Sequence, residues 1–176
     1  MLTDLSDLRV RDLLQLETRV VAELRSRGLV RTSNKPLADI AERVVWVARG
    51  GVLEPNSTKS HDVTDPNGRR IQVKAMGGRA AGRSAKFGSF RSFEFDTAVF
   101  LVFAPDSFDL TLAREVREDE IEAGARYSPR TNARQPTLRQ IERLGIDVTD
   151  EMRAAYDALD GDVVRFRNGP TSGSKK

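Results

Sequence analysis

Polar side chains on both sides of one predicted turn are of the types that bind a divalent metal ion and act on a phosphate. Asp62 precedes the turn Asp-Pro-Asn-Gly at residues 65–68, and Gln72 and Lys74 follow it. Proline presets the backbone for a turn and Asn-Gly tolerates positive φ, so this stretch predicts a β-hairpin. Alternate residues of a strand share a face, so Gln72 and Lys74 emerge together. The hairpin therefore brings a carboxylate, an amide and an ammonium group to one place.

This set of groups predicts a site that holds a divalent metal ion and a phosphate. Asp62 offers the hard oxygen that Mg²⁺ prefers, Gln72 its amide oxygen, and Val73 its main-chain carbonyl. Lys74 orients or deprotonates the attacking water, or neutralises charge that develops on the phosphoryl group. Glu42, on a predicted helix, supplies a second carboxylate. The hairpin alone leaves an alternative open, in which Asp62 caps a turn and Lys74 is a solvated surface residue.

The distribution of charge predicts a polyanionic partner. The net charge is only +3, but between residues 65 and 93 seven basic residues face a single acid, Asp65. Such a basic stretch beside a candidate metal site favours nucleic acid, most naturally DNA, over a small neutral substrate. The alternative is that these arginines lie in solvated loops. The candidate nucleic-acid contacts are Thr58, Lys59, Arg69, Arg79, Arg83, Lys86 and Arg91.

Aromatic and basic residues further along the chain extend this prediction. Phe87 and Phe90 are candidates for stacking on bases. Arg126, Arg130 and Arg134 form a second basic set near Tyr127, with a solvated loop as the alternative.

The composition predicts one folded domain in the cytoplasm. The chain has 176 residues, of which 39% are hydrophobic and 31% charged. No apolar run approaches the roughly 18–20 residues of a membrane helix, and the first residues lack a basic-then-apolar signal. There is no cysteine, which excludes disulfides, thiolate zinc sites and cysteine nucleophiles.

Periodicity predicts an α/β fold with a central mixed β-sheet flanked by α-helices. The predicted helices are 4–27, 37–48, 117–125, 137–144 and 149–159. The predicted strands are 51–54, 60–65, 69–75, 95–103 and 108–116. Residues 76–91 and 126–136 are predicted loops. We expect a single nuclease-like domain over 1–164, with a core at about 30–116 and a helical part at 117–164, and a flexible tail at 165–176.

Taken together, these segments resemble the restriction-endonuclease-like, or PD-(D/E)xK, nuclease superfamily, and in particular its small bacterial members. The resemblance covers roughly residues 30–116. The segments that carry it are Pro36-Leu37-Ala38-Asp39-Ile40-Ala41-Glu42, Glu54-Pro55-Asn56-Ser57-Thr58-Lys59-Ser60-His61-Asp62, Asp65-Pro66-Asn67-Gly68-Arg69-Arg70, Ile71-Gln72-Val73-Lys74 and Phe93-Glu94-Phe95-Asp96.

The resemblance implies Mg²⁺-dependent phosphodiester hydrolysis on a mixed sheet with helices on both sides. Glu42 matches the helical glutamate, Asp62 the metal-binding aspartate, Gln72 the second acidic position and Lys74 the lysine. Gln72 departs from the usual Glu or Asp, which removes a negative charge and lowers the expected metal affinity.

We therefore expect a metal-dependent endonuclease acting on DNA, and a homodimer if both strands are cut. Two alternatives stay open from the sequence. One is a non-catalytic nucleic-acid-binding module on the same scaffold, and the other is a protein-interaction subunit.

Overall fold

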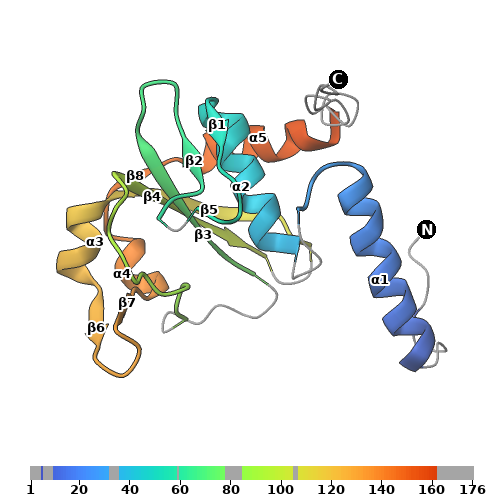
Figure 1. Ribbon diagram of the computed structural model, residues 1–176, viewed down its shortest axis with the longest axis horizontal. Coiled ribbons are helices and arrows are strands. Elements are labelled where there is room, and N and C mark those ends of the chain that lie inside the picture. Colours follow the sequence, from blue (N-terminus) through green and yellow to red (C-terminus); the bar gives the residue numbers. More distant parts are fainter. Residues whose placement is uncertain are drawn as a thin grey trace, which may run out of the picture.

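The computed structural model describes residue 5 and residues 10–31, 36–58, 60–77, 85–104 and 107–161 (Figure 1). In these residues the helices are α1 Val10–Ser26, α2 Pro36–Arg49, α3 Glu118–Gly124, α4 Leu138–Ile141 and α5 Thr149–Gly161. The strands are β1 Val52–Leu53, β2 Val63–Thr64, β3 Arg70–Met76, β4 Thr97–Phe103, β5 Leu110–Arg117, β6 Arg126–Ser128, β7 Ala133–Gln135 and β8 Ile146–Asp147. The predicted mixed α/β class is confirmed. Counting only the described residues, none of the helices is long and apolar enough to cross a membrane.

The main sheet has the strand order β1-β2-β3-β4-β5-β8. Strands β3 and β4 pair in parallel, and all other neighbours pair antiparallel. The middle strand β4 is the apolar run of the sequence, and every one of its residues is buried. Its side chains alternate between two separate core clusters, with Leu101 in one and Phe100 in the other. A strand that is apolar on both faces needs a covering layer on each side.

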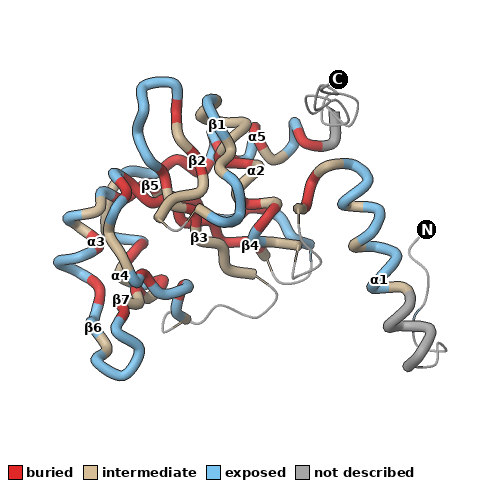
Figure 2. The backbone as a smooth tube through the Cα atoms, in the orientation of Figure 1, coloured by how far each residue is buried: buried red, intermediate tan, exposed pale blue. Residues whose placement is uncertain are grey.

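Helices α2 and α5 cover one face of the sheet (Figure 1). Helix α2 contributes Ala41, Val44 and Val45, whose spacing forms one apolar stripe. Helix α5 contributes Met152 and other apolar residues to the same cluster. Figure 2 shows buried positions along the sheet and these helices, while residues 16–26 of α1 are mostly exposed.

The opposite face is covered by α3, α4 and the chain segment at residues 85–95 that leads from β3 towards β4. Phe87 and Phe90 lie on Phe100 of β4, with ring centroids 4.9 and 6.0 Å away. Both phenylalanines are almost completely buried. The prediction that they stack on bases is therefore wrong, because β4 presents an apolar face that needs their rings.

The predicted hairpin is confirmed. Gly68 has a φ of 82° and donates its amide to the carbonyl of Asp65 over 2.9 Å, which closes the turn. Val63 pairs with Ile71 across β2 and β3. Asp62 precedes β2 and also bonds to β3, because its amide donates to the carbonyl of Ile71 over 2.9 Å, while Gln72 and Lys74 share one face of β3.

Residues 126–136 are not a plain loop, because they contain the two-stranded hairpin β6–β7. The hairpin is held by the segment at residues 85–90, since Phe90 and Arg134 exchange main-chain hydrogen bonds of 2.8 and 2.9 Å. Strand β8 was also not predicted. Helix α1 begins at Val10, and residues 4 and 6–9 of the predicted helix lie outside the described residues, as does the predicted tail at 165–176.

Candidate active site

Asp62 is tied into the hairpin by its main chain and meets Gln72 through its side chain. Its amide donates to the carbonyl of Ile71 over 2.9 Å, which docks this residue on β3. Its carboxylate oxygen Oδ2 accepts two hydrogen bonds, from Gln72 Nε2 at 2.6 Å and from the amide of Val73 at 2.7 Å. Gln72 thus turns its amide nitrogen, rather than its oxygen, towards the carboxylate. Within the described residues the second oxygen of Asp62 has no hydrogen bond.

The pKa of the Asp62 carboxyl is raised, because burial disfavours its charged form. Four groups act in the opposite direction: the Val73 amide, which donates a hydrogen bond, and then the charges of Lys74, Arg31 and His61. They do not cancel the effect of burial. A cation bound beside this carboxylate would therefore stabilise its charged form.

Lys74 lies on the same face of β3 and is confined by the segment at residues 85–92. Its Nζ sits 4.9 Å from the ring centre of Phe90. A Cβ atom at Gly88 would lie 3.6 Å from Cδ and 3.8 Å from Nζ of Lys74, which shows how closely the backbone approaches the side chain. Burial lowers the pKa of Lys74, and the charges of Asp62 and Glu42 oppose this shift. The lysine thus lies within the electrostatic reach of both carboxylates.

Glu42 extends from α2 towards the same group of charges. Burial, followed by the charge of Asp62, raises its pKa to about 7, although Arg31 acts against this shift. Arg31 donates from Nη2 to Glu42 Oε2 and from Nη1 to the main-chain oxygen of Glu54. Our sequence reasoning missed Arg31. It precedes α2 in a connection without periodicity, so no local pattern marks it as a partner of Glu42.

The donor atoms at this site fit a hard divalent cation. They are the carboxylate of Asp62, the amide of Gln72, the carbonyl of Val73 and the carboxylate of Glu42. The Val73 carbonyl oxygen lies 3.5 Å from Gln72 Nε2, so it belongs to the same group. All are oxygen donors once the Gln72 amide presents its oxygen, and such donors suit Mg²⁺ or Mn²⁺. The described residues include no group of three or more His, Cys, Asp or Glu side chains able to hold a metal.

A cleft of about 310 Å³, which we call the Lys74 cleft, opens beside these residues. It is lined by Gln72, Lys74 and residues 89–92. Arg91 is exposed at its side and is the one predicted nucleic-acid contact among the lining residues. The ring of Phe90 forms part of the wall.

The other predicted nucleic-acid contacts lie apart from this cleft or outside the described residues. Arg69 is 47% exposed, but it pairs with Asp65 at 2.8 Å as part of the turn. Thr58 is partly buried, and its amide closes a short turn onto Pro55. Lys86 is exposed and lines a different cleft. The residues outside the described part are Lys59, Arg79 and Arg83.

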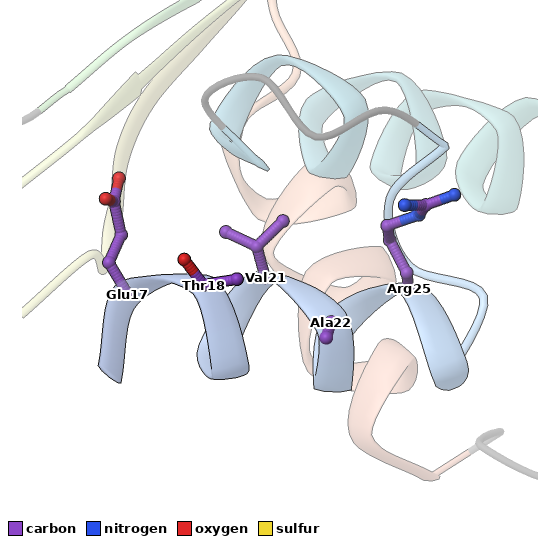
Figure 3. A pocket seen from close by; sticks show the side chains of 5 residues that line it. All are labelled: Glu17, Thr18, Val21, Ala22 and Arg25. Atoms are coloured by element: carbon purple, nitrogen blue, oxygen red, sulfur yellow. The ribbon is translucent and has the colours of Figure 1, made fainter. Parts of the chain in front are cut away.

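A further hollow, of about 210 Å³, lies on α1 and contains none of the candidate residues (Figure 3). Its lining consists of Glu17, Thr18, Val21, Ala22 and Arg25. These five side chains come from a single helix, as Figure 3 shows. They offer no set of groups comparable to that around Asp62.

Comparison with models of known protein families gives no match, and comparison with curated protein sequences gives no significant match. The candidate site therefore rests on its own geometry, which joins Asp62 to Gln72 by a hydrogen bond and to Lys74 and Glu42 by charge.

Proposed function

We propose that this protein is a metal-dependent endonuclease that hydrolyses phosphodiester bonds in DNA. The observation that carries the proposal is the grouping that the hairpin produces: Asp62 accepts a hydrogen bond from Gln72, which lines the same cleft as Lys74, and the charges of Asp62 and Lys74 interact. A half-buried carboxylate and a half-buried lysine whose pKa values are both shifted by burial are the kind of perturbed pair that marks functional sites. A turn cap beside a solvated lysine would show neither perturbation.

Each residue has a role that its surroundings support. Asp62, the Val73 carbonyl and Gln72, after rotation of its amide, hold the cation, and Glu42 adds a second carboxylate. The bound ion supplies Lewis acidity and lowers the pKa of a coordinated water. Lys74 lines the cleft, where its side chain orients or deprotonates the attacking water. When protonated, the same side chain neutralises charge on the phosphoryl group.

The arrangement of the helices around the sheet also supports the proposal. A mixed sheet with helices on both faces is what the resemblance to restriction-endonuclease-like nucleases implies. Glu42 on α2 also interacts with Asp62, as expected for a helical glutamate that faces the metal-binding aspartate. We therefore propose a restriction-endonuclease-like core formed by α2 and β1–β4.

The basic residues favour DNA as the substrate. Arg91 stands at the Lys74 cleft, where a phosphate next to the cleaved bond would lie. Lys86 is exposed on the same segment. Contacts of this kind to phosphates are independent of base sequence and weaken with added salt.

The direct test is cleavage of supercoiled plasmid and of short labelled duplexes with Mg²⁺ or Mn²⁺. Wild type is expected to nick or cut, while Asp62→Ala and Lys74→Ala are expected to be inactive. Asp157→Ala, which changes an exposed aspartate on α5, serves as the matched control and should keep full activity. Equal inertness of wild type and both site variants over varied substrates, in folded protein, would end the enzymatic proposal.

A second candidate, a nucleic-acid-binding module without catalysis, is favoured by one observation. Gln72 donates its amide to Asp62, so in this arrangement the two side chains satisfy each other without an ion. This candidate predicts salt-sensitive DNA binding that persists in EDTA and in Asp62→Ala, with no cleavage. Calorimetric titration with Mn²⁺ separates the two, because only the nuclease requires binding of the ion.

A further inference from the structure

We propose that the β6–β7 hairpin and the neighbouring Lys86 form a second nucleic-acid contact, in which Tyr127 stacks on a base and Lys86 and Arg126 bind phosphates. This inference rests on the proposed function, because it adds a separate contact for the same substrate. It concerns a cleft of about 490 Å³ that we call the Tyr127 cleft.

The lining of the Tyr127 cleft is suited to a nucleotide. Lys86 and Arg126 provide two positive charges, and Ser128 and Thr131 provide hydroxyl groups. No carboxylate is among the described residues that line it. An anion that enters the cleft therefore meets cations and hydrogen-bond donors without a like charge beside it.

Tyr127 is held as an exposed aromatic platform. The residue is 47% exposed. Its hydroxyl donates to Asn132 Oδ1 at 2.9 Å, and the guanidinium carbon of Arg134 lies 5.7 Å from its ring centre. Arg134 is itself fixed, since Nη1 donates to the carbonyl of Ala125 at 3.0 Å. The ring is thus ordered before any ligand arrives, which lowers the entropy lost on binding.

The amide side chains of this cleft are already used within the protein. Gln135 donates to the carbonyl of Phe87 at 2.8 Å, and Gln140 donates to the carbonyl of Gly124 at 2.7 Å. Bidentate reading of a base edge needs a free amide or guanidinium. Stacking on Tyr127 accepts any base, because every base has a π face. We therefore infer a contact that tolerates many sequences.

The Tyr127 cleft adjoins the Lys74 cleft through one short segment. Lys86 lines the first cleft, and residues 89–92 line the second. The segment is fastened to the hairpin by main-chain hydrogen bonds, including Phe87 to Pro136 at 3.0 Å and Phe90 to Arg134 at 2.8 Å. Lys86 and Arg91 are five positions apart in the chain, so their Cα atoms are at most about 17 Å apart even when the segment is fully extended, or about five steps of a DNA strand. One strand can therefore engage both clefts.

The test is DNA binding by fluorescence anisotropy in EDTA, where cleavage does not interfere. A labelled single strand and a labelled duplex of mixed sequence serve as probes. Tyr127→Ala and Tyr127→Leu should each bind roughly tenfold more weakly, while Tyr127→Phe, which keeps the ring, should bind within about twofold of wild type. Phe108→Ala removes another exposed aromatic ring and is the matched control.

A charge test accompanies the stacking test. In the double variant Lys86→Gln with Arg126→Gln, the fall of log affinity with log salt should become shallower, its slope smaller in magnitude by about 1.5. The double variant Arg19→Gln with Arg143→Gln, which changes two exposed arginines elsewhere, should leave the slope unchanged. Circular dichroism on every variant establishes that it is folded.

The outcomes separate this inference from the proposed function. If wild type binds or cuts DNA and the Tyr127 and Lys86–Arg126 variants behave like their controls, the inference is overturned and the nuclease proposal stands. If folded wild type binds neither probe at low salt, both fail. Loss of binding in Tyr127→Ala and Tyr127→Leu with recovery in Tyr127→Phe supports the stacking contact.

Discussion

Two aspartates three residues apart, Asp62 and Asp65, have opposite surroundings. Asp65 sits in the turn, where both of its carboxylate oxygens are occupied. Oδ1 accepts from the amides of Asn67 and Arg69 at 2.8 and 2.9 Å, and Oδ2 accepts from Arg69 Nε at 2.8 Å. The Arg69 hydrogen bond is the main reason that the pKa of Asp65 is lowered. At Asp62 the effect of burial prevails, and the pKa is raised.

The difference separates a structural carboxylate, whose two oxygens are both hydrogen-bonded within the fold, from a carboxylate with an oxygen available to a ligand. Asp65 stabilises the folded protein because the Arg69 guanidinium and two main-chain amides stabilise its charged form more than water does. At Asp62, burial disfavours the charged form, and the second carboxylate oxygen has no hydrogen bond within the described residues. The oxygen of Asp62 that accepts no hydrogen bond from the described residues is therefore available to bind a cation.

The largest expected effect is on activity. Asp62→Asn should lower the rate of DNA cleavage by about three orders of magnitude, because it removes the charge that holds the ion. Asp65→Asn should change the rate per folded molecule by less than about threefold, because both carboxylate oxygens of Asp65 are occupied by hydrogen bonds within the turn. Cleavage rates under single-turnover conditions, normalised to folded protein, check this pair. Equal losses in the two variants would erase the distinction between the aspartates.

The second-largest expected effect is on how the free energy of unfolding depends on pH, through Glu42. With a pKa of about 7 instead of 4.5, folded Glu42 keeps a proton that the unfolded chain releases. Stability therefore falls as pH rises from 4.5 to 7, by an amount on the order of 3 kcal/mol in the absence of metal. Glu42→Gln should lack this fall. Urea unfolding in EDTA at pH 4.5 and pH 8 measures it, and parallel pH profiles for the two proteins would contradict it.

Asp65→Ala should destabilise the protein by about 2 kcal/mol, because it leaves two turn amides and Arg69 without their acceptor. The stability that Asp65 provides is present above its unfolded pKa of 3.8 and is lost as pH falls towards its lowered folded pKa. Chemical unfolding at pH 7 gives the size of the effect. An unchanged midpoint would mean that water replaces these hydrogen bonds without loss.

The smallest expected effect sharpens the comparison by adding charge. Gln72→Glu places a second carboxylate against Asp62, so Mn²⁺ should bind about tenfold more tightly in calorimetry. Without metal the same variant should be less stable than wild type, because a hydrogen bond becomes a repulsion. Gln72→Ala is the control, since it removes the hydrogen bond without adding charge, and should not bind the ion more tightly.

Features that depend on neighbours in the chain were predictable from the sequence. The turn at residues 65–68, the shared face of Gln72 and Lys74, and helix α2 follow from local turn chemistry and periodicity. The burial of β4 follows from its uninterrupted apolar run. These signals depend on a few adjacent side chains, so they persist whatever the rest of the fold does.

Features that depend on distant pairings were not predictable. The β6–β7 hairpin is stabilised by hydrogen bonds from residues 85–90. The sequence of residues 126–136 contains no local pattern that indicates this pairing. Arg31 reaches Glu42 only once the connection before α2 is folded back. Likewise, a sequence does not tell which end of the Gln72 amide faces Asp62. These details arise from tertiary contacts, which leave no period in the chain.

The outermost strands of the main sheet, β1 and β8, are each only two residues long. A sheet border recruits another chain by offering a row of free main-chain donors and acceptors, and a border this short offers almost no template. Growth of the sheet by addition of a further strand, whether from a peptide or from another copy, is therefore disfavoured. At β1 and β8, contact with another chain therefore depends on side chains more than on main-chain pairing.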